Sequence, residues 1–395
     1  MKILFLNHNY KGEGTYNRAA PLARELSKLG HKVTLFCSNN KYPSYKIEYV
    51  EGDFNEVLFP TLTRRRDYFW YLIRPILAGI ETRKEKYDLV HAFTMAEPMS
   101  FLPAKYMCKR KFPLIVDWDD WYGKGGMAEF KPAGWFFKPF TSYLEDNGAK
   151  MGMGLTVVSE CLYNRAKSLG ISEKRIEIIG NGSNYDRIYP LERNACKKDL
   201  GFPVDKPIVL YLGWFNKALY IALEAFKSLE SDFPDAQFVC VGRVSRKHDH
   251  LEEYNGLLNY AESSPRYHFT GQQPYEKVPK YLGAADIVLL PMEDTIHEHA
   301  RFPIRLGDFL AAGRTVLASN IGEVGRIIRK NKCGVVANSP EQFKIRLNDL
   351  LSNPQRREWL EHLARQTAKH SLSWSGLAAN LEEFYNKSFN FYSGK

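Results

Sequence analysis

The sequence lacks the cysteine patterns of zinc-binding and disulfide-rich proteins. Its six cysteines are scattered, and no two of them lie at C-x-x-C spacing. Structural zinc sites need closely spaced ligand pairs, and small secreted folds rely on a framework of disulfides. The cysteine pattern therefore argues against both classes and indicates a reducing compartment.

Long hydrophobic runs are also missing. A membrane-spanning helix needs about 20 mainly apolar residues in succession, and no run in the chain approaches that length. The first residues, MKILFLNHNYKGEG, hold an apolar run that is too short for the core of a signal peptide and predicts a first β-strand. We therefore expect a cytoplasmic location.

The chain carries an uneven excess of positive charge. Its formal net charge is +10. Residues 1–180 hold 27 Lys and Arg against 20 Asp and Glu, whereas the remainder holds 28 against 25. The asymmetry suggests that the N-terminal half faces an anionic partner, although a solvated basic surface has the same composition. We expect no nucleic-acid partner, because no recognition motif accompanies the charge.

Short apolar runs alternate with helical patterns along the chain. Those before residue 180 are KILFLNH, KVTLFCS, DLVHAF, LIVDW, LTVVS and IEIIGNG, and those after residue 200 are PIVLYLG, AQFVCVG, RYHFTG, DIVLLPM, TVLAS and GVVAN. Strands buried on both faces and separated by helices form parallel sheets. Two such series predict an α/β protein with two Rossmann-like, doubly wound domains, covering residues 1–183 and 184–374. The helical pattern in residues 375–395 is predicted to cross back onto the first domain.

Ligands of such sheets bind at the carboxyl ends of strands. After the first strand, Gly12 and Gly14 open a helix, so backbone amides there can approach a phosphate or an acceptor group. Asn17 occupies the third glycine position of a G-x-G-x-x-G motif, which weakens a dinucleotide interpretation. The alternative is a flexible turn without a ligand.

A second strand end predicts a diphosphate clamp. Arg301, Arg305 and Asp308 are spaced by four and then three residues, which places them on one face of a turn and helix that starts near Pro303. Two guanidinium groups there can hold a diphosphate, and the carboxylate can accept hydrogen bonds from a ribose diol. The alternative is an Arg305–Asp308 ion pair on a solvated face.

Further donor-binding candidates follow other strands of the second domain. Gly213 ends one strand, and Lys217 comes just before the next helix, where it can reach a phosphate; an ordinary exposed lysine is the alternative. Arg243 and Gln272 are assigned to the same donor site, and the residues from Gly271 to Pro274 to recognition of the base.

The chain resembles the retaining, nucleotide-sugar-dependent glycosyltransferases of the GT-B type, especially the group-1 (family 4) set. The segments that carry the resemblance are GEGTYNRAAPLARELSKLGHKVTLF, YDLVHAF, VVSECLYNRAKSLGISEKRIEIIGNGSN, EAFKSLESDFPDAQFVCVG, FTGQQPYEKVPKYLGAADIVLLPM, GDFLAAGRTVLAS and SWSGLAANLEEFY. They span nearly the whole chain. The resemblance implies two domains that face a central cleft, with the acceptor bound by the first and the donor by the second.

The resemblance also implies roles in the donor site. The family's ribose-binding glutamate corresponds to Asp308, and its preceding motif glutamate falls near Ala300 and is absent or displaced to Glu298. Trp214 stands where the family has an arginine after the glycine. Lys217 is retained as the phosphate lysine.

In the first domain, a histidine that the family places near the reacting sugar falls on Phe93, beside His91, and a second one falls on Asp119. His91, Asp119 and Asp120 are therefore the predicted catalytic residues, with Asp119 or Asp120 acting on the acceptor hydroxyl or the reacting sugar. Trp118 or Trp121 is predicted to stack on a sugar, and the alternative is a purely structural cluster.

The implied reaction is a retaining transfer, of EC 2.4 type, from a nucleotide-diphosphate sugar to a glycan or lipid-linked acceptor in cell-surface polysaccharide or glycolipid synthesis. No cofactor or metal is expected, because Asp-x-Asp metal motifs such as that of Asp117 and Asp119 belong to the other main glycosyltransferase fold. A sugar-nucleotide epimerase of the same fold and a catalytically silent relative acting as a binding or scaffold subunit are the alternatives.

Residues 61–86 and 130–140 combine basic and aromatic side chains. This composition is typical of segments that lie on an anionic membrane surface, which would place the protein on the inner face of the cell membrane. A core-facing helix with a solvated basic face is the alternative, and Pro75 would kink any continuous helix.

Overall fold

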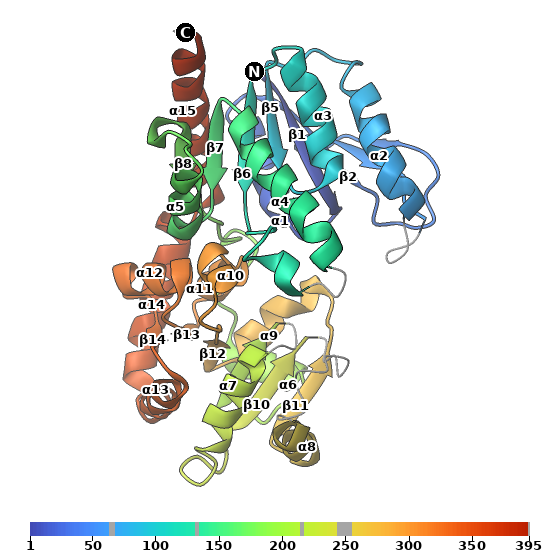
Figure 1. Ribbon diagram of the computed structural model, residues 1–395. Helices are drawn as coiled ribbons and strands as arrows, with labels where there is room; N and C mark the ends of the chain where they lie inside the picture. Colours follow the sequence, from blue (N-terminus) through green and yellow to red (C-terminus); the bar gives the residue numbers. More distant parts are fainter. Residues whose placement is uncertain (63–67, 131–133, 214–216, 243–254, 394–395) are drawn as a thin grey trace. The chain divides into compact units, whose positions relative to one another are not determined.

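The computed structural model describes residues 1–62, 68–130, 134–213, 217–242 and 255–393 (Figure 1). The chain divides into two compact units. Unit 1 consists of Met1–Asn181, His299–Phe302 and Trp374–Lys395, and unit 2 of Gly182–Glu298 and Pro303–Ser373. Among the described helices, none is long and apolar enough to cross a bilayer.

Unit 1 is built on an eight-stranded sheet in the order β3-β4-β2-β1-β5-β6-β7-β8. Only the β3–β4 pair is antiparallel among these neighbours. The strands are β1 (Lys2–Tyr10), β2 (Lys32–Ser38), β3 (Glu48–Val50), β4 (Asn55–Phe59), β5 (Leu89–Phe93), β6 (Leu114–Trp118), β7 (Gly154–Val157) and β8 (Ile176–Ile178). Because β1, β5 and β6 are parallel neighbours, the loops that follow them meet at one edge of the sheet.

Helices cover this sheet (Figure 1). They are α1 (Tyr16–Lys28), α2 (Tyr68–Glu81), α3 (Pro98–Lys109), α4 (Gly134–Met151), α5 (Glu160–Ser168) and α15 (Trp374–Ser393), with short 3-10 turns η1 (Met127–Phe130) and η2 (Glu173–Arg175). The C-terminal helix α15 returns to unit 1, as predicted, because Ala378, Leu381 and Phe384 bury their side chains in one core with Leu22 and Leu26 of α1.

Unit 2 holds a six-stranded parallel sheet in the order β11-β10-β9-β12-β13-β14. Its strands are β9 (Ile208–Leu212), β10 (Gln237–Val241), β11 (Tyr267–Gly271), β12 (Ile287–Leu290), β13 (Thr315–Ser319) and β14 (Val335–Ala337). Its helices are α6 (Arg193–Asp199), α7 (Lys217–Lys227), α8 (Asn255–Ser263), η4 (Tyr275–Lys277), α9 (Val278–Ala284), α10 (Ile296–Ala300), α11 (Arg305–Ala311), α12 (Gly322–Asn331), α13 (Pro340–Ser352) and α14 (Pro354–His370).

Two features differ from the sequence-based expectation. The strands β3 and β4 were not predicted, because a three-residue strand and a strand beginning with Asn and Glu give little periodic signal. The short segment His299–Phe302 belongs to unit 1, although it lies within the predicted second domain. Its backbone carbonyl groups hold it there: Ala300 O accepts a hydrogen bond from Ser159, and Phe302 O accepts one of 2.6 Å from Asn181.

A fully buried ion pair joins α1 to the centre of the first sheet. The Arg18 side chain is 1% exposed, and the Asp117 side chain is completely buried. Arg18 donates through Nε and Nη2 to Asp117, at 3.0 and 2.8 Å. Its guanidinium also donates to the carbonyl oxygens of Ile179 and Gly180, at 2.7 and 2.6 Å. The pair therefore ties α1, β6 and the chain after β8 together at the carboxyl edge of the sheet.

We expect Arg18→Met to destabilise unit 1 by roughly 3–5 kcal/mol, because Asp117 would remain buried without its cation. Hydrogen exchange in peptides from β1 and β6 measures the loss. The control is Arg24→Met on the same helix, which removes the partly exposed Arg24–Asp53 pair and costs about 0–1 kcal/mol. Equal protection in both variants would contradict the prediction.

Candidate functional site

The Asp119 carboxylate lies at the carboxyl edge of the unit 1 sheet, just beyond β6. Thr15 Oγ1, at the start of α1, donates to Asp119 Oδ2 at 2.5 Å. Thr94 Oγ1, just after β5, donates to Asp119 Oδ1 at 2.9 Å. Both threonines are buried, whereas Asp119 is partly exposed. Three loops thus hold the carboxylate of one partly exposed residue.

The environment of Asp119 favours the protonated carboxyl group. Burial raises its pKa to about 7, and the negative charge of the neighbouring Asp117 adds to the effect. The hydrogen bonds from Thr15 and Thr94 oppose the rise without cancelling it. A carboxyl group that titrates near neutrality can accept or donate a proton under ordinary conditions, which is what a group acting on a hydroxyl needs.

The structure contradicts a catalytic role for His91, because the side chain is completely buried. Nδ1 lies 2.6 Å from the Tyr385 hydroxyl of α15, and Nε2 lies 3.3 Å from Thr156 Oγ1. Burial lowers the pKa of His91 to about 3. A neutral imidazole bound on both sides fastens α15 to the sheet and cannot touch a substrate.

The two tryptophans of the acidic segment are not free platforms for a sugar. Trp118 is 1% exposed, so its predicted stacking role is wrong. The Arg165 guanidinium carbon lies 4.7 Å from the Trp118 ring centre and 4.2 Å from that of Trp121. Trp121 is partly exposed, but one face is covered by Arg165, and its Nε1 donates to Lys124 O at 2.8 Å.

A buried glutamate of α4 holds the loop that follows Asp119. Glu145 accepts hydrogen bonds of 2.9 Å from the backbone N–H groups of Tyr122 and Gly123, and one of 2.7 Å from Arg165. A Cβ at Gly123 would lie 2.9 Å from the Ser142 backbone and 2.8 Å from the Glu145 carboxylate, so a larger residue would displace this loop. Asp120 starts this loop and accepts the backbone N–H of Trp121 at 2.9 Å.

The glycine loop after β1 serves α1 itself. Gly14 has φ +53°, and a Cβ there would lie 2.7 Å from the Asn9 side chain. Asn9 Oδ1 accepts the backbone N–H of Thr15 at 2.9 Å. Gly14 is thus needed so that Asn9 can bond the start of α1 and position Thr15. Gly12, at φ +82°, is exposed with open space beside it and is the part of the loop that a ligand can approach.

In unit 2, Arg305 lies against the end of β9. Its Nη1 donates to Leu212 O at 2.7 Å. A Cβ at Gly213 would lie 1.9 Å from the same nitrogen, so a larger residue there would push the guanidinium away from the strand end. At the end of the neighbouring strand β10, a Cβ at Gly242 would lie 1.8 Å from the backbone oxygen of Gly213, and φ there is +150°, so this position requires glycine. The sequence thereby places a guanidinium on bare backbone at the carboxyl edge of this sheet.

Asp308, one turn further along α11, is buried, and both of its carboxylate oxygens accept hydrogen bonds. Asn184 Nδ2 donates to Oδ1 and the Tyr275 hydroxyl donates to Oδ2, both at 3.1 Å. Burial raises the pKa of Asp308 to about 6, and the two hydrogen bonds only partly offset this. Tyr275 is half exposed, so its hydroxyl connects the buried carboxylate to the surface.

The remaining donor candidates have different positions. Lys217 is exposed at the first turn of α7, and Gln272 is exposed after β11. Arg243 lies outside the described residues. Arg301 precedes α11 and belongs to unit 1, so the expected helical face shared with Arg305 and Asp308 is not formed. The helix begins only at Arg305, after Pro303.

Sequence reasoning missed several polar partners of these residues. These partners are Thr15, Thr94, Asn184, Tyr275 and Glu145; Thr15, Asn184 and Tyr275 lie within segments that carry the family resemblance but were not singled out there. Thr94 has φ +57°, which is unusual for a β-branched residue. The one available signal was position, because Thr15 and Thr94 follow strand and loop ends at the same sheet edge.

Glu298, the displaced motif glutamate, is buried on α10. Among the described residues, no group of metal-binding side chains is found.

Two family descriptions match the chain, one over each half. Glycosyltransferase Family 4 matches residues 14–187, and Glycosyl transferases group 1 matches residues 192–367. Together they cover most of both units.

The curated relatives are about one quarter identical to this chain, and each aligns with about half of it. The spore coat protein SA of Bacillus subtilis is 26% identical over 207 residues, 49% of this chain and 52% of the relative. The D-inositol 3-phosphate glycosyltransferase of Thermobispora bispora is 24% identical over 232 residues, 54% of this chain and 51% of the relative. The chain thus spans about half the length of the curated relatives it matches.

Solved structures share the fold over the whole chain. Sucrose-phosphate synthase from Thermosynechococcus elongatus superposes with a TM-score of 0.75 at 16% identity, covering 99% of both chains. Anabaena HepE in complex with UDP superposes with a TM-score of 0.70 at 15% identity, covering 98% of this chain and 100% of that one. These neighbours confirm the predicted arrangement of two Rossmann-like domains as the GT-B fold.

The raised pKa predicts that the Asp119 carboxyl titrates with a midpoint near pH 7. The folded chain then holds a proton that the unfolded chain releases at lower pH, so stability falls as the pH rises from about 4 to about 7. Asp119→Asn should remove this part of the fall. Carboxyl ¹³C shifts give the midpoint, and thermal unfolding at pH 5 and 8 gives the slope. Asp53→Asn, at an exposed site, is the control, and an unchanged slope in Asp119→Asn would refute the assignment.

Proposed function

Because the chain belongs to the group 1 and family 4 glycosyltransferases, we propose that it transfers a sugar, with retention of configuration and without a metal, from a nucleotide-diphosphate donor to a glycan or lipid-linked acceptor. The observation that carries this proposal is the packing of Arg305 on Gly213 beside the buried Asp308, at the carboxyl edge of the unit 2 sheet. This edge is where sheets of this type bind nucleotides.

The donor is proposed to bind unit 2. Arg305 and Lys217 supply positive charge for the diphosphate, and Gly213 lets the Arg305 guanidinium lie against the strand end. Asp308 is the group for the ribose hydroxyls, with Asn184 and Tyr275 holding the carboxylate in place. UDP-sugars are the first donors to examine, because the structural neighbour HepE was crystallised with UDP and with UDP-glucose.

The acceptor is proposed to bind unit 1. In the transfer, the bond between the anomeric carbon and the diphosphate breaks, the acceptor oxygen bonds to that carbon, and the acceptor proton passes to the departing phosphate. Asp119 would accept a hydrogen bond from the acceptor hydroxyl and stabilise positive charge on the sugar. The hydroxyl groups of Thr15 and Thr94 hold the carboxylate for this role. We propose synthesis of a cell-surface polysaccharide or glycolipid as the process served.

The proposal is tested by incubating the protein with UDP-, GDP- and ADP-linked sugars, with a chelator present, and following release of the nucleotide. Release with a chelator present is the expected result. An epimerase would instead yield a new sugar nucleotide, and a silent relative would bind the nucleotide without turnover. Either outcome would overturn the proposed reaction.

Asp308→Asn should weaken binding of the matching nucleoside diphosphate by about 10- to 100-fold, because a hydrogen bond to a charged group is replaced by a neutral one. Isothermal titration calorimetry measures the change. Asp349→Asn, which removes a partly exposed partner of Arg356 on unit 2, should bind like the parent protein. Unchanged binding in Asp308→Asn would exclude a ribose contact.

Asp119→Asn should lower the turnover rate by about 100-fold or more, because electrostatic stabilisation of the transition state by one positioned group contributes on this scale, while nucleotide binding by unit 2 stays unchanged. Steady-state transfer rates and calorimetry on the same sample separate the two effects. If Asp119→Asn and Asp120→Asn both kept full activity, the acidic segment would have only a structural role.

A further inference from the structure

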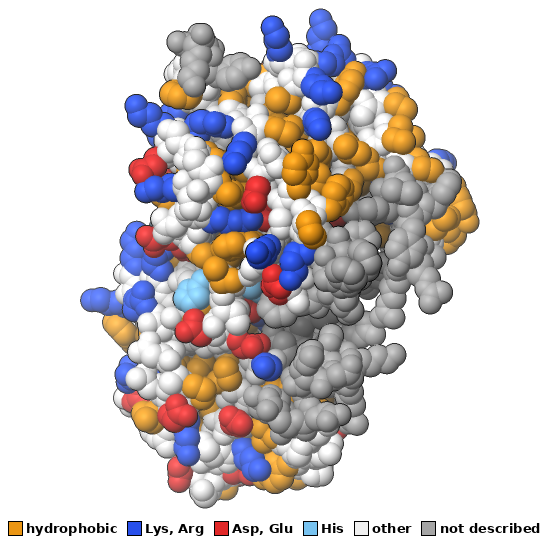
Figure 2. Space-filling model, viewed as in Figure 1, with side chains coloured by type: hydrophobic (Ala, Val, Ile, Leu, Met, Phe, Trp, Pro, Cys, Tyr) orange, Lys and Arg blue, Asp and Glu red, His pale blue; other side chains and the backbone are white. Residues whose placement is uncertain are grey.

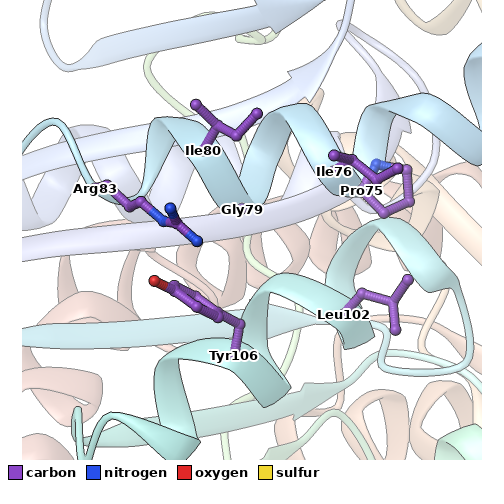
Figure 3. Close-up of a pocket in the computed structure, with 7 residues that line it drawn as sticks. All are labelled: Pro75, Ile76, Gly79, Ile80, Arg83, Leu102 and Tyr106. Carbon is purple, nitrogen blue, oxygen red and sulfur yellow. The ribbon is translucent and has the colours of Figure 1, made fainter.

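The outer surface of α2 and α3 carries exposed aliphatic side chains. Ile76 and Ile80 are 62% and 48% exposed, and Leu102 is 48% exposed. Ile76 and Ile80 are one helical turn apart and share a face of α2. With Pro75, Gly79, Arg83 and Tyr106, they line an open groove of about 210 Å³ between the two helices (Figure 3). Burying such a cluster in an apolar medium is favourable, so the surface is suited to a partner.

Positive charge is concentrated at the end of this groove. The guanidinium carbons of Arg83 and Arg110 lie 5.0 and 5.7 Å from the centre of the Tyr106 ring. Arg110 also donates to the Tyr106 hydroxyl at 3.1 Å. Although burial raises it, the pKa of the Tyr106 phenol is lowered, because the hydrogen bond and charge of Arg110 and the charge of Arg83 favour the phenolate.

Nearby acidic side chains are bonded to other cations. Glu85 accepts hydrogen bonds from Lys2 and Lys32, at 3.0 and 2.8 Å. Glu81 pairs with Lys84 at 2.7 Å. The stretch from Pro98 to Pro113 contains no Asp or Glu, and its basic residues are Lys105, Lys109, Arg110 and Lys111, all exposed. Figure 2 shows hydrophobic and basic side chains gathered beside one another over the upper part of unit 1.

We propose that the α2–α3 surface, formed by Ile76, Ile80, Leu102, Arg83, Lys105 and Arg110, binds an anionic lipid bilayer. The aliphatic side chains enter the acyl region, and the basic side chains contact the headgroup phosphates. Charge complementarity favours this occupant, because an anionic bilayer offers an apolar medium and a plane of negative charge together. A soluble polyanion would leave the isoleucines and the leucine in water. The proposal does not depend on the proposed transfer reaction.

The test is co-sedimentation of the full chain with vesicles of phosphatidylcholine alone and of phosphatidylcholine mixed equally with phosphatidylglycerol. Binding is expected only to the mixed vesicles, and it should weaken at high salt. Arg83→Gln combined with Lys105→Gln should reduce the partition coefficient by about fivefold per charge. Ile80→Ser combined with Leu102→Ser should reduce the partition coefficient by about tenfold or more, at low and at high salt alike.

The matched controls lie on α13 of unit 2, where Lys344 and Ile345 are adjacent and exposed. Lys344→Gln with Ile345→Ser should bind vesicles like the parent protein. Circular dichroism checks that every variant is folded, and nucleotide binding is measured separately. Absence of parent binding to the mixed vesicles at low salt would overturn the proposal. So would equal losses in the control, or light scattering that shows a dimer which the Ile80 and Leu102 changes dissociate.

Discussion

The buried ion pair between Arg18 and Asp117 is the interaction on which the first unit's site depends. Two opposite charges removed from water are tolerated only when further hydrogen bonds satisfy them, and here Thr156 and the carbonyl groups after β8 do so. The pair fixes α1 at the carboxyl edge of the sheet. Thr15 at the start of α1 therefore reaches Asp119. The negative charge of Asp117 is one cause of the raised pKa of the Asp119 carboxyl group.

The two units hold the segments at the carboxyl edge of their sheets with different kinds of contact. In unit 1, bulky aromatic and charged side chains secure the loops: Arg165 lies on two tryptophan rings, and Glu145 bonds the backbone of the loop that follows Asp119. In unit 2, glycine makes room, and the Arg305 guanidinium rests directly on the strand end. The first arrangement fixes the loop after Asp119, and the second places a guanidinium against the backbone of a strand end.

Several site residues predicted from the sequence are buried in the structure, because the side chains near a strand end can point either into the core or toward the surface. His91, Trp118 and Asp119 all lie in or next to strands at one sheet edge, and pattern alone made each a candidate. Burial separated them: His91 and Trp118 face the interior, and only Asp119 reaches the surface. The helical spacing of Arg301 with Arg305 failed similarly, because α11 starts after Pro303. The side chains that support the candidates came from other elements and carried no local signal.

The sequence by itself determined the fold class, the two series of strands, the returning C-terminal helix and the family. These follow from local periodicity, glycine positions and motif spacing, which are properties of neighbouring residues. Only the tertiary structure decided which carboxylate is exposed, which threonines hold it and which cations lie beside the aliphatic side chains of α2 and α3. Those outcomes depend on contacts between residues far apart in the chain, such as Thr15 with Asp119 and His91 with Tyr385. Burial and electrostatic environment are set by such contacts and cannot be read from one segment.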